Sequence, residues 1–154
     1  MRGTKHILAD TGRLVTTWLG IPFAEPPLGA RRFQPPQPKA PWSGVLETVS
    51  LAPACPQSSK FSVSSANVTS EDCLYLNIYS AEPQDQEQPR PVMVWLHPGE
   101  FNYGSAAAVN SNKQGMSRSI SDSTLRRAAL HLNLNQSVLP SFTSLQQFKV
   151  YKHT

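Results

Sequence analysis

Residues 70–79, SEDCLYLNIY, are the stretch of this chain that decides its fold. From Cys73 to Tyr79 the residues are apolar or aromatic apart from one amide side chain, that of Asn77. Such a run is typical of a β-strand covered on both faces, because a strand with one solvated face alternates apolar and polar residues. We therefore predict a buried strand over residues 73–79.

A second strand is predicted downstream, over residues 91–97, PVMVWLH. It is apolar from Val92 to Leu96, and the Pro-Gly pair at residues 98–99 ends it. Between the two predicted strands, residues 81–91 are polar and rich in Pro and Gln, which is typical of a surface connection.

Prolines dominate the part of the chain that precedes these strands. Residues 22–29, PFAEPPLG, and residues 34–42, QPPQPKAPW, are not helical, because proline fixes its own φ, lacks an N–H and pushes the preceding residue into extended backbone. We expect stiff extended segments, with Trp42 as the anchor that pins the second one to the core. Further upstream, residues 6–18 alternate loosely around a turn at residues 11–13 and predict a short hairpin.

Charge and proline content divide the 154 residues near position 105. Residues 1–104 contain 8 Lys or Arg and 9 Asp or Glu, whereas residues 105–154 contain 6 and 1. Thirteen of the 14 prolines precede residue 99. The basic residues of the second part are scattered and not interleaved with aromatic side chains, so we expect a solvated surface and no nucleic-acid binding.

The second part carries few structural signals. Ser123 is predicted to cap a short helix with an apolar face made of Leu125, Ala128, Ala129 and Leu132. Elsewhere we expect disorder. No apolar run approaches the roughly 18 residues that span a bilayer, so no membrane span is expected. Only three apolar residues follow the amino-terminal charges, so no signal peptide is expected.

Five sequence blocks closely resemble the amino-terminal part of the type-B carboxylesterases and cholinesterases, in the same order. They are WLGIPFAEPPLG (18–29), RF (32–33), PWSG (41–44), SEDCLYLNIY (70–79) and PVMVWLH (91–97). The EDCLYLN block is a specific signature of that family. The resemblance predicts that residues 7–104 are the amino-terminal part of a carboxylesterase type-B domain. Residues 105–154 are then predicted to be an unrelated, basic, Ser-rich and mostly disordered tail.

The resemblance implies an α/β fold, namely a truncated α/β-hydrolase that holds the amino-terminal strands of the central sheet. It also implies the family chemistry, in which a Ser-Glu/Asp-His triad cleaves carboxylic esters through an acyl-enzyme. The nucleophile of such folds sits in a G-x-S-x-G elbow. This chain has no such pentapeptide: the nearest, GMSRS at residues 115–119, ends in Ser and follows no predicted strand. We expect no catalytic residue, no cofactor and no metal, and an ester substrate only by family resemblance.

One piece of catalytic apparatus is expected to survive. The resemblance places the two N–H donors of an oxyanion hole at Gly99 and Glu100, and each such donor contributes about 2.7 to 4 kcal/mol in working enzymes. Glu100 replaces a glycine whose φ is expected to be positive, and its carboxylate lies beside a site meant for an anion. His97, at the end of the strand, is expected to be structural and not the catalytic base. We therefore predict a weakened oxyanion-hole remnant.

The resemblance also implies structural pairs. It matches Cys55 and Cys73 to the family's first disulfide, which forms if the chain is translocated into an oxidising compartment. It pairs Arg32 with Glu71 as a structural ion pair. Asn67 begins an N-x-T triplet and is a glycosylation candidate in a translocated protein. The family is mostly secreted or held in the endoplasmic reticulum lumen, but with no signal peptide expected the localisation stays open.

Three functional hypotheses remain. The first is that the chain is a serine carboxylesterase or a working piece of one. The second is that it is a truncated relative without hydrolytic activity on its own, and the missing nucleophile, acid and base favour this second hypothesis. The third is a non-catalytic, esterase-like binding or adhesion module, since relatives such as the neuroligins keep the fold and bind partners. The sequence does not identify that protein partner.

Overall fold

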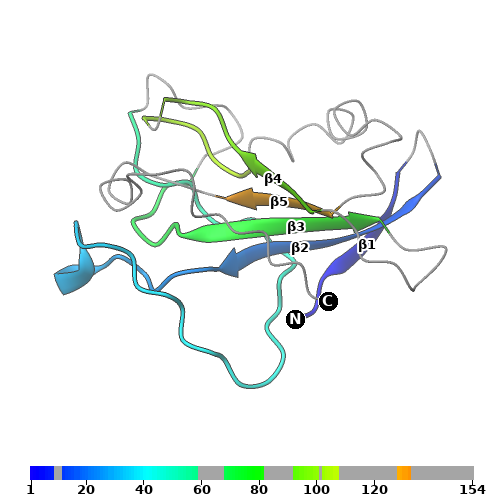
Figure 1. Cartoon of the computed structure of the whole chain (residues 1–154), viewed down its shortest axis with the longest axis horizontal. Helices are drawn as coiled ribbons and strands as arrows, with labels where there is room; N and C mark the ends of the chain where they lie inside the picture. The colour runs from blue at the N-terminus through cyan, green and yellow to red at the C-terminus, as the bar shows by residue number, and fades with distance from the viewer. Residues whose placement is uncertain (9–11, 59–67, 82–91, 101, 108–127, 133–154) are drawn as a thin grey trace.

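A computed structural model describes residues 1–8, 12–58, 68–81, 92–100, 102–107 and 128–132. These residues form strands β1 (Thr4–Ile7), β2 (Leu14–Pro22), β3 (Tyr75–Ala81), β4 (Val92–Leu96) and β5 (Ala128–Leu132), and a 3₁₀ turn, η1 (Gly29–Arg31). The five strands make one sheet in the order β1-β2-β3-β5-β4, with the long strands β2 and β3 in its middle (Figure 1).

The predicted amino-terminal hairpin is confirmed. β1 and β2 are antiparallel, with Ile7 opposite Leu14 and Thr4 opposite Thr17. Along β2, buried and half-buried residues alternate without interruption, as the period of two in a strand requires. One face of the sheet is therefore well covered along β2.

Both strands predicted from the apolar runs are also confirmed, as β3 and β4. Coverage is less complete than the sequence predicts. Asn77 and Tyr79 of β3 are each 3% exposed, whereas Leu76 and Ile78 on the other face are half-buried. β4 is an edge strand with Val92 and Leu96 exposed. The physical reason is that the described part of the chain contributes no α-helix to cover this side of the sheet.

β5 corrects one prediction. A helix was expected over residues 123–132, but residues 128–132 form a strand between β3 and β4. β5 runs antiparallel to β3 and parallel to β4. Hydrogen-bonding partners on both sides override a weak helical preference, because propensity differs by less than about 1 kcal/mol per residue. The other residues of the predicted helix, 123–127, lie outside the described residues, and the predicted disorder of the tail stays a prediction.

The Pro-rich segment between β2 and residue 58 forms extended backbone that runs from the end of β2 through η1 and back beneath the sheet (Figure 1). The prediction that Trp42 anchors it was wrong, because this side chain is 43% exposed. Glu25 holds the segment instead. Its carboxylate accepts hydrogen bonds from the Ala40 N–H and the Lys39 ammonium, both at 2.9 Å, and these contacts lower the pKa of Glu25.

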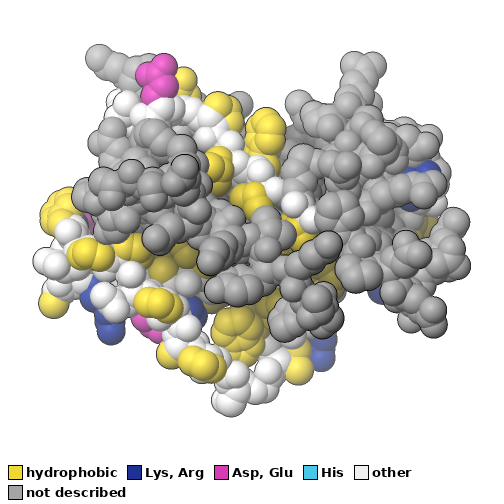
Figure 2. All heavy atoms as spheres, in the orientation of Figure 1, with side chains coloured by type: hydrophobic (Ala, Val, Ile, Leu, Met, Phe, Trp, Pro, Cys, Tyr) yellow, Lys and Arg dark blue, Asp and Glu magenta, His cyan; other side chains and the backbone are white. Residues whose placement is uncertain are grey.

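The best-buried apolar cluster lies where this segment meets the start of β3. It consists of Ala24, Cys55, Cys73 and Leu74, with Phe23 packed against them. Figure 2 shows hydrophobic side chains along the middle of one face of the molecule, with Lys and Arg side chains at separate points around its edge. The best-buried cluster thus includes Cys73 and Leu74 of the EDCLYLN block.

Candidate functional site

The loop that follows β4 is built on two glycines whose conformations other residues rarely adopt. Gly99 has φ of 133° and Gly104 has φ of 104°. The Gly99 carbonyl accepts hydrogen bonds from the N–H groups of Asn102 (2.8 Å) and Tyr103 (3.1 Å). A Cβ at Gly99 would overlap the carbonyl oxygen of Tyr103. The chain therefore turns back on itself directly after the strand, and Gly99 is buried in the turn.

Glu100 adopts the left-handed conformation expected for this position, with φ of 52°. Glu100 is exposed, and its backbone carbonyl accepts a hydrogen bond of 3.2 Å from the Asn102 side chain. A glutamate at positive φ carries a steric cost of about 1 to 2 kcal/mol, which a glycine avoids. The backbone geometry of a glycine position is thus retained although the residue is not a glycine.

His97 lies at the entrance of the same loop. Its Nδ1 is 3.0 Å from the carbonyl oxygen of Pro98, and because a carbonyl can only accept, this contact requires the proton on Nδ1. Nε2 of the same ring is buried and has no hydrogen-bond partner among the described residues. Among the described residues no carboxylate forms a hydrogen bond with the His97 ring, and its structural role stays a prediction.

The predicted disulfide is present: Cys55 and Cys73 are joined across 18 positions, with both residues almost fully buried. The bridge fixes the segment around Cys55 to Cys73, two residues before β3 begins. Gln57 lies two residues after Cys55, and its carboxamide reaches the loop after β4. It donates to the Gly104 carbonyl (3.0 Å) and accepts from the Gly104 N–H (2.9 Å).

Asn77 forms a second connection to the same part of the chain. Its side chain, from the middle of β3, donates to the carbonyl of Ala106 across 3.3 Å. Ser105, between these anchored residues, is 2% exposed. Sequence reasoning did not assign roles to Gln57 or Asn77. The signal for Asn77 was present, because it is the one amide in an otherwise apolar and aromatic run.

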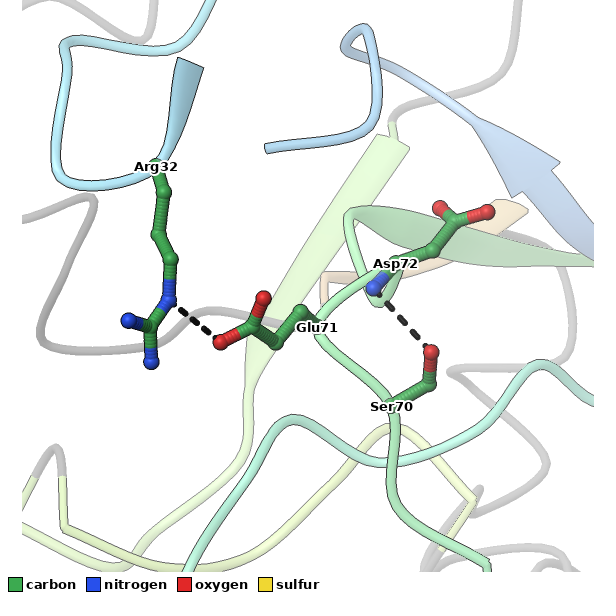
Figure 3. A network of polar contacts seen from close by, with 4 residues as sticks. All are labelled: Arg32, Ser70, Glu71 and Asp72. Carbon is green, nitrogen blue, oxygen red and sulfur yellow. Dashed lines mark hydrogen bonds and ion pairs between the residues drawn. The ribbon is translucent and has the colours of Figure 1, made fainter. Parts of the chain in front are cut away.

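The structure brings together Arg32 and Glu71, as expected, from the turn after η1 and the segment before β3. Figure 3 shows the two side chains pointing toward each other, with Nε of Arg32 2.5 Å from a carboxylate oxygen of Glu71. Both side chains are substantially exposed, at 53% and 38%. Beside them, Ser70 Oγ accepts from the Asp72 N–H. Burial and a hydrogen bond with Asp72 raise the pKa of the neighbouring Tyr75 to about 12.

Two predicted features lie outside the described residues: the glycosylation candidate Asn67, and Ser117 of the GMSRS pentapeptide. The described segments hold no group of three or more His, Cys, Asp or Glu side chains arranged to bind a metal ion. What they do hold is a glycine-rich turn after β4 with two positive-φ residues in succession, Gly99 and Glu100.

Comparison with known proteins decides the family. A family model described as "Carboxylesterase family" matches residues 1–119. This chain belongs to the carboxylesterase family. The match extends past residue 104, where we expected the family segment to end, and that boundary stays a prediction.

Similar carboxylesterases agree with this membership. Carboxylesterase 3 of Homo sapiens is 40% identical over 121 residues, which cover 73% of this chain and 21% of that protein. The liver carboxylesterase of Sus scrofa is 46% identical over 103 residues, which cover 60% of this chain and 18% of that protein. A thermophilic PNB esterase of known structure matches with a TM-score of 0.67 and 31% identity, over 86% of this chain and 26% of the other.

The sheet is therefore part of an α/β-hydrolase fold, as predicted. The chain spans about a fifth of the length of the carboxylesterases that it matches. Among the residues that the structure describes, no helix has the length and apolar character needed to cross a bilayer.

Proposed function

We propose that this carboxylesterase segment supplies the oxyanion loop of an ester-hydrolysing fold but does not hydrolyse esters on its own. The observation that carries the proposal is that the 154 residues contain no G-x-S-x-G pentapeptide. Covalent ester hydrolysis needs a serine activated by an adjacent base, and the strand-to-helix elbow is what exposes that serine in this fold. Without one, no acyl-enzyme forms.

The geometry after β4 supports the part of the proposal that concerns the loop. Successive positive φ values at Gly99 and Glu100 give a local backbone turn in which neighbouring N–H groups can converge on an anion. The carboxylate of Glu100 opposes that role. Two like charges 4 Å apart in water repel by about 1 kcal/mol, which is less than the contribution of one good oxyanion donor. We infer a weakened but not abolished capacity to stabilise an oxyanion.

The test is to incubate the purified full chain with a fluorophosphonate probe and, separately, with p-nitrophenyl acetate. We expect no stoichiometric serine adduct and no turnover above that of the denatured chain. Ser117→Ala is the matched control, because Ser117 is the serine of the nearest elbow-like pentapeptide. A stoichiometric adduct in the wild type that disappears in this variant would overturn the proposal.

A second candidate is a non-catalytic binding module, and the exposed edge of the sheet favours it. Val92 and Leu96 of β4 are 44% and 37% exposed, although both are large apolar residues. Large apolar residues grouped on a surface are typical of protein contacts. Saturable binding of a purified partner should then be lost in Val92→Asp and kept in Val45→Asp, whose side chain is also exposed but lies outside the sheet. Equal binding by both variants would contradict this role for β4.

A further inference from the structure

The carboxamide of Gln57 makes three hydrogen bonds that connect two distant parts of the chain. Its Nε2 donates to the Gly104 carbonyl (3.0 Å) and to the Cys55 carbonyl (3.1 Å), and its Oε1 accepts from the Gly104 N–H (2.9 Å). The pair of bonds to Gly104 is the pair that one residue of an antiparallel strand exchanges with the residue opposite it. One side chain thus satisfies both backbone groups of Gly104, 47 positions away.

Gly104 is the point at which the end of the loop touches its beginning. A methyl group at this position would lie 2.6 Å from Nδ1 of His97 and 2.7 Å from the Pro98 carbonyl oxygen. The two residues that it contacts directly precede Gly99. Fixing the backbone of Gly104 therefore also fixes the two residues that lead into the turn with Gly99 and Glu100.

The other end of the connection is rigid. Gln57 lies two residues after Cys55, and the Cys55–Cys73 disulfide joins this segment to the start of β3. Cys55 and Cys73 belong to the buried apolar cluster. The backbone that carries Gln57 is therefore fixed, so its side chain can position the loop after β4.

We propose that Gln57 is a positioning residue that holds the loop of residues 97–104 in the conformation that presents the Gly99 and Glu100 N–H groups. This inference rests on the proposed function of the loop. Gln57 does not touch a reacting group; it acts through Gly104 on the backbone that does.

Substitution of Gln57 by glutamate separates positioning from a general effect on folding. A protonated carboxyl can still donate to the Gly104 carbonyl and accept from its N–H. A carboxylate can only accept, and its oxygen in the place of Nε2 would face the carbonyl oxygens of Gly104 and Cys55, which Nε2 reaches at 3.0 and 3.1 Å and which repel a negative charge. In Gln57→Glu the loop should therefore be held at low pH and released as pH rises through the carboxyl pKa. Gln57→Ala lacks both groups at every pH. Gln34→Glu is the matched control, because Gln34 is exposed and its side chain lies outside these contacts.

The readout is amide hydrogen exchange of the full chain, measured by NMR as protection factors below and above the carboxyl pKa. We expect the Gly104 N–H to lose at least about tenfold in protection in Gln57→Ala at both pH values, and in Gln57→Glu only at the higher one. The Glu100 N–H resonance should shift in the same pattern. Amides of β2 and β3, such as those of Trp18 and Ile78, should keep their protection.

Unchanged protection of Gly104 in both variants would overturn the role of Gln57. Loss of protection throughout β2 and β3 would also overturn it, because Gln57 would then act on global stability. Neither result bears on whether the chain hydrolyses esters. Labelling of a serine by the fluorophosphonate would instead overturn the proposed function and leave the result for Gln57 intact.

Discussion

Asn77 accepts a hydrogen bond from the backbone N–H of Gly20 across 2.9 Å, from the middle of β3 to an irregularity in β2. The register between these strands shifts between Trp18 and Ile21, and Gly20 has φ of 68°. A bulge leaves a backbone group without its ladder partner. The side-chain oxygen of Asn77 accepts from that group, the Gly20 N–H, and its Nδ2 donates to the Ala106 carbonyl. One buried amide therefore couples the bulge of β2 to the segment that follows the candidate oxyanion loop.

Asn77→Ala should destabilise the chain by about 3 kcal/mol. The substitution removes the partner of the Gly20 N–H and that of the Ala106 carbonyl, and each buried group without a partner costs about 1 to 3 kcal/mol. Urea denaturation followed by circular dichroism measures the change. Gln34→Ala, at an exposed position, should shift the free energy of unfolding by less than about 0.5 kcal/mol. Equal effects of the two substitutions would contradict the importance of the Asn77 amide.

Gly104→Ala should cost more stability than Gly44→Ala. Both glycines have positive φ, so both alanines are strained, but the space around Gly44 is open while a Cβ at Gly104 would lie 2.6 Å from His97 Nδ1. The steric overlap at Gly104 adds to the backbone strain, and we expect a difference of about 1 to 3 kcal/mol between the two variants. Thermal and urea unfolding of the two variants provide the comparison. Matching losses would mean that the loop shifts freely and that Gly104 is not a tight contact.

Raising the pH should destabilise the fold through Tyr79. Burial raises the pKa of Tyr79 to about 12 from its ordinary value of 10. The folded-state pKa is the higher one, so this stabilisation is complete below pH 10 and is lost as the pH rises toward 12. Two pKa units correspond to about 2 to 3 kcal/mol. Between pH 10 and 12, the free energy of unfolding of Tyr79→Phe should therefore fall by about 2 to 3 kcal/mol less than that of the wild type. Urea titrations at a series of pH values measure this difference. An unchanged pH dependence would show that Tyr79 is ionised with little penalty.

Reduction of the Cys55–Cys73 disulfide should lower stability by about 3 kcal/mol, as expected for a bridge across 18 positions. The Gly104 amide should lose protection as well, because Gln57 is held beside Cys55. The measurement is urea unfolding and hydrogen exchange with and without dithiothreitol. A variant with Cys55→Ser and Cys73→Ser should not respond to the reductant. If reduction leaves Gly104 protected, the disulfide and the loop are not coupled.

The ion pair of Arg32 and Glu71 should contribute little. Both side chains are more than one third exposed, and exposed pairs contribute about 0.2 to 1 kcal/mol. A double-mutant cycle with Arg32→Ala and Glu71→Ala measures the coupling energy directly. Addition of salt should reduce it, because the contact is open to screening. A coupling well above about 1 kcal/mol would show that the pair is less solvated than its exposure indicates.

The candidate site was only partly predictable. Gly99 and Glu100 were assigned to the site through the resemblance to the carboxylesterases, in the loop directly after a recognisable apolar strand, and Glu100 has a positive φ. Gln57 was missed, because a glutamine in a loop carries no periodic signal and its partner lies 47 positions away. Trp42 was misjudged, because a large aromatic residue favours burial but does not require it.

By itself, the amino-acid sequence determined the strands β2, β3 and β4, the extended course of the Pro-rich segment and the resemblance to the carboxylesterases. These follow from local chemistry, namely apolar periodicity, the fixed φ of proline and specific sequence blocks. Tertiary structure alone decided that residues 128–132 are a strand between β3 and β4, and that the amides of Gln57 and Asn77 form hydrogen bonds with Gly104 and Ala106. Such pairings depend on backbone groups far apart along the chain, which meet only once the sheet has formed.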